Sequence, residues 1–183
     1  MIEMAQADSL INGQAHTLSD ADNPQGIGHP RVSVTYYTAD EVIRQFLGLY
    51  YCLDFKAELE DIGITRLQFI RRGKAIREFR AICIALWGLA LQKSFPNDAG
   101  DFFSEFREKA PMLVGGGKES ARLYERVNAY IEMLELKKDT DFSTVADLLA
   151  KTLAPHAEEV PRLRLRLSLI IRNLYVLIFD KLV

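Results

Sequence analysis

The sequence predicts an all-α protein in which about six helices pack around one long central helix. The first indication is segment 66–95, where apolar residues recur at helical spacing and become continuous over residues 81–91. The second is a series of further apolar stripes at the same spacing, separated by residues that start or stop helices. The third is the composition: 49% of the 183 residues are hydrophobic and 26% are charged. These proportions are typical of one globular domain with a sizeable core.

The central helix, predicted for residues 66–95, has two different halves. In the first half the apolar and the basic residues take opposite sides. The apolar side holds Phe69, Ile76, Phe79 and Cys83, and the basic side holds Arg66, Lys74, Arg77 and Arg80. The second half is apolar all round, which indicates burial on every side. We therefore expect a helix that is exposed and basic at its start and central to the core at its end.

Residues 1–37 are predicted to form an irregular or partly extended tail ahead of a single helical domain, residues 38–183. The tail is rich in Asn, Asp, Gln, Gly and Pro, and only residues 31–37 alternate as a short strand would. Its start lacks the basic and apolar regions of a signal peptide, and the longest apolar runs are too short or too interrupted to span a bilayer. Cys52 and Cys83 lie within predicted helices, as buried thiols do in a reducing compartment. Together these features predict a cytoplasmic protein.

The first predicted helix begins at Thr38 and runs to about residue 61. Thr38 and Glu41 have the spacing of a capping box, and Gly63 suits the left-handed position that closes a helix. Thr65 and Gln68 form a second capping box. This predicts that the central helix follows directly, so that the first two helices form a tight antiparallel hairpin.

Three shorter helices are predicted next. Pro96 ends the central helix, and a third helix to about residue 110 points its phenylalanines inward. A glycine-rich loop at 111–117 leads to a fourth helix, 118–138, and a fifth follows at 142–153.

The last segment, 161–183, is ambiguous at its start. Residues 162–169 alternate strictly, as a strand would, but no turn signal separates them from the apolar run that follows, and the combined length favours a helix. On a helix this segment has two apolar faces, the second formed by Leu165, Leu169, Val176 and Val183. A helix at the edge of a monomer needs only one such face, so we expect the second to be a two-fold contact in a homodimer. The alternative is a layered monomer in which both long helices are interior.

No pattern of catalytic or metal-binding chemistry is present in the sequence. The histidines are His16, His29 and His156, and no Glu-x-x-His pair or Cys/His cluster accompanies them. Gly117-Lys118 fails the spacing of a phosphate-binding loop, and no nucleophile motif occurs. We therefore predict no catalytic, cofactor-binding or metal-binding residue, and the sequence favours a non-enzyme.

The charges around residue 63 are unusual because both signs oppose their own helix dipoles. Cations crowd the start of the central helix, and acids crowd the end of the helix before it. The cations are Arg66, Arg71, Arg72, Lys74, Arg77 and Arg80, and the acids are Asp54, Glu58, Glu60 and Asp61. We expect Asp54, Glu58 and Asp61 to lie within pairing reach of Arg66, Arg71 or Arg72. Arginines that instead point into an open cationic groove would favour nucleic-acid binding, with Arg162, Arg164 and Arg166 as a second patch.

The leading hypothesis is a non-catalytic helical interaction or adaptor protein that associates with itself or with another protein. The candidate partner-binding residues are Arg71, Arg72, Lys74, Arg77, Leu165, Leu169 and Val176. The alternative is nucleic-acid or anion binding through the basic start of the central helix. A third hypothesis is a ligand pocket lined by Tyr50, Tyr51, Trp87 and phenylalanines, although aromatic stripes are more often plain core.

Overall fold

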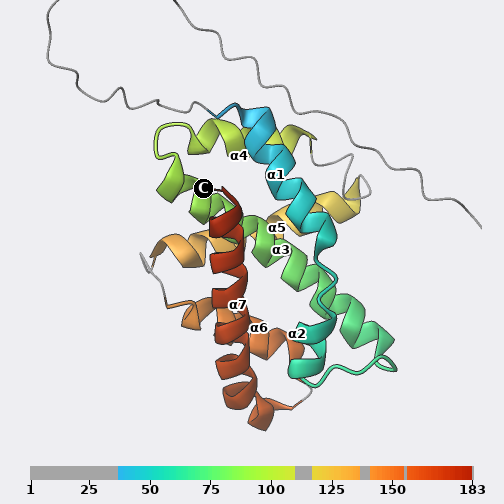
Figure 1. Ribbon diagram of the computed structural model, residues 1–183. Helices are drawn as coiled ribbons and strands as arrows, with labels where there is room; N and C mark the ends of the chain where they lie inside the picture. Colours follow the sequence, from blue (N-terminus) through green and yellow to red (C-terminus); the bar gives the residue numbers. More distant parts are fainter. Residues whose placement is uncertain (1–36, 110–116, 137–140, 155, 183) are drawn as a thin grey trace, which may run out of the picture. The chain divides into compact units, whose positions relative to one another are not determined.

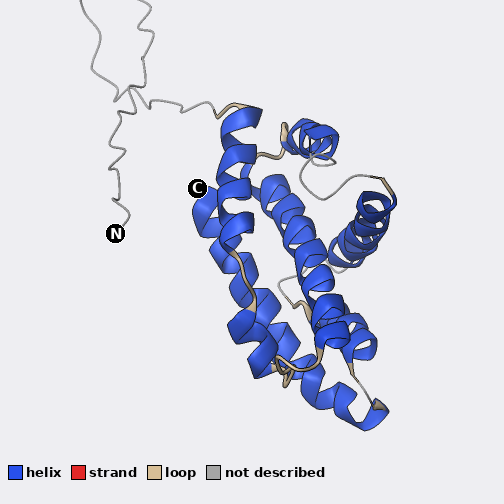
Figure 2. Ribbon diagram, turned by 90° about the vertical axis from the view of Figure 1, so that its right-hand side faces the viewer, coloured by secondary structure: helices blue, strands red, loops and turns tan. Residues whose placement is uncertain are grey.

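A computed structural model describes residues 37–109, 117–136, 141–154 and 156–182, and all regular structure in these ranges is helical (Figure 1, Figure 2). The all-α prediction is therefore confirmed. The elements are α1 (Ala39–Cys52), α2 (Lys56–Asp61), α3 (Phe69–Ser94), α4 (Ala99–Lys109), α5 (Lys118–Leu136), α6 (Ser143–Leu153), the 3-10 turn η2 (Ala157–Glu159) and α7 (Val160–Leu182). The predicted tail, apart from Tyr37, and the predicted loop at 111–117, apart from Gly117, lie outside the described residues.

Helix α3 is the centre of the core, as predicted. Helices α4, α5, α6 and α7 all contact it, and every residue from 81 to 91 is buried except the half-buried Leu89. The single tryptophan, Trp87, stacks on Phe46 of α1 with ring centroids 4.5 Å apart and meets the ring of Phe106 of α4 edge-on at 4.9 Å. Aromatic side chains thus join α1 and α4 to the middle of the central helix.

The predicted first helix is divided into α1 and α2, so its prediction as one continuous element is wrong. The break is at Phe55, whose backbone is left-handed with φ of 54°. The Asp54 side chain accepts a hydrogen bond from the backbone N–H of Lys56 at 3.0 Å, a local turn that competes with the helix. The bend buries Phe55 against Phe79 of α3, with ring centroids 5.4 Å apart. Burial of this ring, about 2–3 kcal/mol, offsets a backbone strain of about 1–3 kcal/mol.

Both ends of the α1–α2 segment carry the predicted cap signals. Thr38 and Glu41 form the capping box, and the Glu41 carboxylate accepts from the Thr38 N–H at 2.9 Å. At the other end Gly63 takes φ of 75°, and the N–H of Ile64 donates to the carbonyl of Leu59 at 2.8 Å. This is the predicted glycine cap, with Ile64 packed back into the core.

The second capping box, at Thr65 and Gln68, does not form. Helix α3 begins at Phe69, its N-cap Gln68 has no side-chain cap bond, and residues 65–68 make a turn in which the Gln68 N–H donates to the Thr65 carbonyl at 3.2 Å. The reason is that Ile64 is fixed inside the core and the chain leaves the core directly after it. The prediction of a tight hairpin is also wrong, because α2 and the turn at residues 65–68 separate α1 from α3 along the chain. Helix α1 contacts α7 and α4 as well as α3.

The C-terminal segment is one helix, α7, including the alternating residues 162–169. One face packs against α6, α3 and α1 and buries Leu163, Leu167, Ile170, Ile171, Leu174, Ile178 and Leu182. The second apolar face, at Leu165, Leu169 and Val176, is exposed. The alternative in which both long helices are interior is therefore wrong. Within the described ranges, no helix combines the length and apolar character needed to cross a membrane.

Candidate functional site

The start of α3 does not carry the predicted ion pairs with the acids before it. Among the described residues, Asp54 pairs with Lys56 at 2.6 Å, and neither Glu58 nor Asp61 has an ion pair with a side chain. The predicted ion pairs of these acids with Arg66, Arg71 or Arg72 are therefore not formed, although the charge of Arg72, after the larger effect of Lys56, contributes to lowering the pKa of Asp54. The chain turns at Phe55 and again at Gly63, and Glu58 of α2 lies near Cys83 in the middle of α3 and not beside the cations at its start.

Two cations of α3 contact the end of a different helix instead. Arg71 donates through Nε to the carbonyl oxygen of Leu153 at 3.0 Å, and Lys74 donates through Nζ to that of Thr152 at 2.7 Å. Both carbonyls belong to the last turn of α6, where the helix dipole is negative and free acceptors remain. The unfavourable position of these cations on their own helix is thus compensated by the C-terminus of α6.

The other cations at the start of α3 have no such partner. Arg66, Arg72 and Arg77 make no hydrogen bond or ion pair with any residue that the structure describes. Arg66 and Arg77 are exposed and Arg72 is half-buried. This end of α3 therefore keeps a positive surface that the fold does not neutralise.

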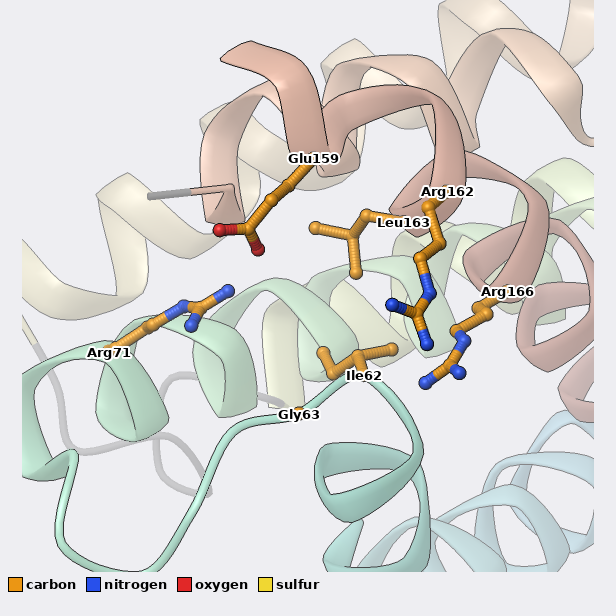
Figure 3. Close-up of a pocket in the computed structure, with 7 residues that line it drawn as sticks. All are labelled: Ile62, Gly63, Arg71, Glu159, Arg162, Leu163 and Arg166. Carbon is orange, nitrogen blue, oxygen red and sulfur yellow. The ribbon is translucent and has the colours of Figure 1, made fainter. Parts of the chain in front are cut away.

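Arg71 also lines a pocket with two arginines of α7 (Figure 3). The pocket has a volume of about 220 Å³, and its lining consists of Ile62, Gly63, Arg71, Glu159, Arg162, Leu163 and Arg166. Figure 3 shows Arg162 and Arg166 side by side from α7, with Arg71 and Glu159 pointing toward one another across the space. Arg166 also donates to the backbone carbonyl of Asp61, which ties α7 to the end of α2.

The pocket holds three guanidinium groups and one carboxylate, and Glu159 forms no ion pair with them. Its net charge is positive, and guanidinium groups recognise carboxylate and phosphate groups through paired N–H donors. Its size suits one anionic group and not a nucleic-acid duplex. The pocket thus brings together the two basic patches that the sequence predicted. Arg71 is its only residue from the start of α3, and Arg162 and Arg166 come from α7.

Next to these cations lies an exposed apolar group, which we call the α3 tip and define as Leu67, Phe69 and Ile70. Their exposed fractions are 82%, 75% and 91%. Phe69 was predicted to face the core and does not, because it is the first residue of the helix and lies beyond the helices that cover the rest of α3. Figure 1 shows this end of α3 extending past the other helices. The exposure of Ile70 could be predicted, since Ile70 shares the basic side of the helix with Lys74 and Arg77.

A second exposed apolar group, the α7 stripe, consists of Leu165, Leu169 and Val176. Their exposed fractions are 67%, 56% and 49%. A hollow of about 130 Å³ lies beside the stripe, lined by Leu53, Glu58, Ile170, Asn173, Leu174 and Leu177. Leu177, which follows Val176 directly and is 38% exposed, is one of the residues that line this hollow.

A buried polar cluster joins α3 to α5, and no pattern in the sequence predicted it. Glu78 is only 9% exposed, and its Oε2 accepts bonds from Arg126 at 2.9 and 3.0 Å and from the Tyr130 hydroxyl at 2.5 Å. Burial raises the pKa of Tyr130, and the bond to Glu78 raises it further. All three groups satisfy one another, so the cluster holds the two helices together.

The two cysteines differ in exposure. Cys83 is fully buried, as predicted, and burial raises the pKa of its thiol. Cys52 is exposed at the end of α1, which corrects its prediction as a buried thiol. In the described part of the chain, no group of three or more His, Cys, Asp or Glu residues is arranged to hold a metal ion.

The aromatic residues proposed to line a ligand pocket pack against one another instead. Phe46, Trp87 and Phe106 are in direct ring contact, and Tyr50 contacts Phe46 with centroids 5.7 Å apart. Comparison of the chain with protein-family models, with curated proteins and with solved structures gave no match. The geometry of the surfaces described above is therefore the basis for any functional proposal.

Proposed function

We propose that this chain is a non-catalytic helical interaction protein that self-associates through the α7 stripe. The observation that carries the proposal is the exposure of Leu165, Leu169 and Val176 in one line on a helix whose opposite face is buried. Removal of apolar surface from water is the main driving force of association. A continuous apolar line of this kind marks an interaction site more often than isolated exposed leucines do.

The charges beside the stripe favour a second copy of the chain as the partner. Arg162 and Asp180 lie about five helical turns apart and therefore on the same flank of α7. Both are exposed, and neither has an ion-pair partner among the described residues. In an antiparallel contact around a two-fold axis near the middle of α7, Arg162 of each copy meets Asp180 of the other. The same axis places Leu165 opposite Val176 and Leu177, so that one surface covers its own copy.

The experiment is a measurement of molar mass by light scattering on the purified chain at micromolar concentration. Wild-type protein is expected to be a dimer, and Leu169→Glu with Val176→Glu is expected to be a folded monomer. A charge-matched control, Gln45→Glu with Asn128→Glu at two exposed positions away from α7, should remain dimeric. A monomeric wild-type protein would contradict the proposal, as would a dimer that the stripe variant leaves intact.

Charge reversal tests the orientation of the two helices. Arg162→Asp and Asp180→Arg should each weaken the dimer by about fivefold or more, because each places like charges in contact twice. The two substitutions together should restore it, since opposite charges then face each other again at both contacts. Additive weakening in the double variant would exclude the antiparallel arrangement.

A second candidate function is anion binding by the basic start of α3, which includes nucleic acid as a possible ligand class. The specific observation that favours it is that Arg66, Arg72 and Arg77 form no ion pair with a described residue, together with the pocket at Arg71, Arg162 and Arg166. Titration with inorganic phosphate and with a single-stranded oligonucleotide at several salt concentrations tests this candidate. Weaker binding by Arg162→Gln with Arg166→Gln would support the pocket, and no binding of either anion at low salt would reject it.

A further inference from the structure

We infer that the start of α3 docks on an anionic lipid surface, with the α3 tip inserted among the lipids and the nearby cations at the level of the headgroups. The inference rests on the second candidate function, anion binding by this end of α3, and names the anion.

The first argument is the combination of apolar and basic residues at one projecting end of a helix. Leu67, Phe69 and Ile70 are among the most exposed large apolar side chains of the described chain. Residues 62–77 contain five cations and no acid. The chain as a whole has a net charge of −2, so this positive region is local and not a general property of the protein. Amphipathic elements that bind membrane surfaces combine these same two features.

The second argument is the order of the side chains along α3. Ile70 and Arg77 lie on one exposed face, and Arg77, which forms no ion pair with a described residue, follows Ile70 by about 10 Å along the helix axis. An apolar side chain inserted at the boundary between headgroups and acyl chains would bring this cation to the depth of the phosphates. Among the helices that the structure describes, the start of α3 projects farthest to the right in Figure 1, so the tip stands out on that side.

The third argument concerns the chemistry of the tip, which suits lipid better than nucleic acid. Leu67 and Ile70 are aliphatic and have no ring on which a base could stack, and Phe69 is the only aromatic side chain of the tip. The tip also has a shallow apolar hollow, formed by residues 67–71, and its only charged lining residue is Arg71. A polynucleotide would leave Leu67 and Ile70 in water, whereas an acyl boundary removes them from it.

The test is flotation of the full chain with vesicles of phosphatidylcholine alone and of phosphatidylcholine with phosphatidylserine. We expect binding to the vesicles that contain phosphatidylserine, and at least tenfold weaker binding to phosphatidylcholine alone. Leu67→Glu with Ile70→Glu should weaken binding by about a hundredfold. Arg72→Gln with Arg77→Gln should weaken it by about twenty-fivefold, about fivefold for each cation. The control Gln45→Glu with Asn128→Glu has the same added charge as the tip variant and should bind as wild type does.

Fluorescence provides a readout of insertion. Trp87 is fully buried and its emission should not change. An added tryptophan, Ile70→Trp, should shift its emission to shorter wavelength when phosphatidylserine vesicles are added. The shift should be absent with an oligonucleotide.

The outcomes separate this inference from the candidate function on which it rests. Binding of phosphate or an oligonucleotide without binding to vesicles would overturn the lipid assignment and leave anion binding intact. Vesicle binding that the tip variant does not weaken would overturn insertion. Light scattering could also show that Leu67→Glu with Ile70→Glu is a monomer while Leu169→Glu with Val176→Glu stays a dimer. The tip would then be the contact between subunits, and both this inference and the proposed role of the α7 stripe would be overturned.

Discussion

Lys74 Nζ lies 2.7 Å from the carbonyl oxygen of Thr152, and Arg71 contacts the next carbonyl of the same helix end. These two residues are far apart in sequence from α6, and they place positive charge directly on the last carbonyls of α6, in addition to Lys151 of that turn. The cations at the start of α3 consequently divide into a pair that stabilises the fold and a group that remains free.

Replacement of Arg71 or Lys74 by Ala should lower the free energy of unfolding by about 0.3–1 kcal/mol each, because the α6 carbonyls lose a charged donor. Hydrogen exchange should become faster in the last turn of α6. The matched variants Arg72→Ala and Arg77→Ala, which remove cations without a partner, should stay within about 0.5 kcal/mol of wild type in chemical denaturation. Equal losses of unfolding free energy in all four variants would contradict the division of these cations into a stabilising pair and a free group.

Glu78→Ala should lower the free energy of unfolding by about 1–3 kcal/mol, because Arg126 and Tyr130 lose the acceptor that they share. This loss of stability is smaller than that expected for a fully buried ion pair, because the Arg126 side chain is 36% exposed. Thermal and chemical denaturation measure it, with Glu125→Ala, an exposed acid on α5, as the control. A Glu78→Ala protein as stable as the control would show that the cluster contributes nothing to packing of α3 on α5.

A thiol reagent should modify one cysteine in the native protein and two after denaturation. Cys52 is exposed, whereas burial removes Cys83 from the reagent and raises the pKa of its thiol, which disfavours the reactive thiolate. Cys52→Ser should abolish the native reaction. Rapid modification of Cys83 in that variant would mean that the core around α3 opens more readily than its packing indicates.

Stability should fall at alkaline pH through the buried tyrosines. Burial raises the pKa of Tyr50 to about 12 and also raises that of Tyr130, compared with about 10 in the unfolded chain. A raised pKa in the folded state means that the stabilisation is complete below pH 10 and is lost as the pH rises through 10 toward 12. Denaturation at several pH values measures the slope, and Tyr50→Phe should reduce it. Tyrosinate absorbance that appears fully near pH 10 in the folded protein would contradict the prediction.

The sequence alone determined the helical class, the central position of α3 and several helix ends, because these depend on local features. Apolar spacing placed residues 81–91 in the core, and Thr38, Glu41 and Gly63 acted through hydrogen bonds to nearby backbone atoms. The second apolar face of α7 was also found from spacing, and the structure shows that it is exposed. Whether a second copy covers it remains a prediction.

The tertiary structure alone decided how the charges are used and where the central helix begins. Burial of Phe55 on Phe79 and of Ile64 at the end of α2 divides the first helix and delays the start of α3, although local cap signals predicted otherwise. The partner of Lys74 is a carbonyl of Thr152, 78 residues away, and the meeting of Arg71 with Arg162 and Arg166 also depends on packing. Periodicity assigns a residue to one side of its own helix, whereas the neighbour on that side depends on contacts between distant segments.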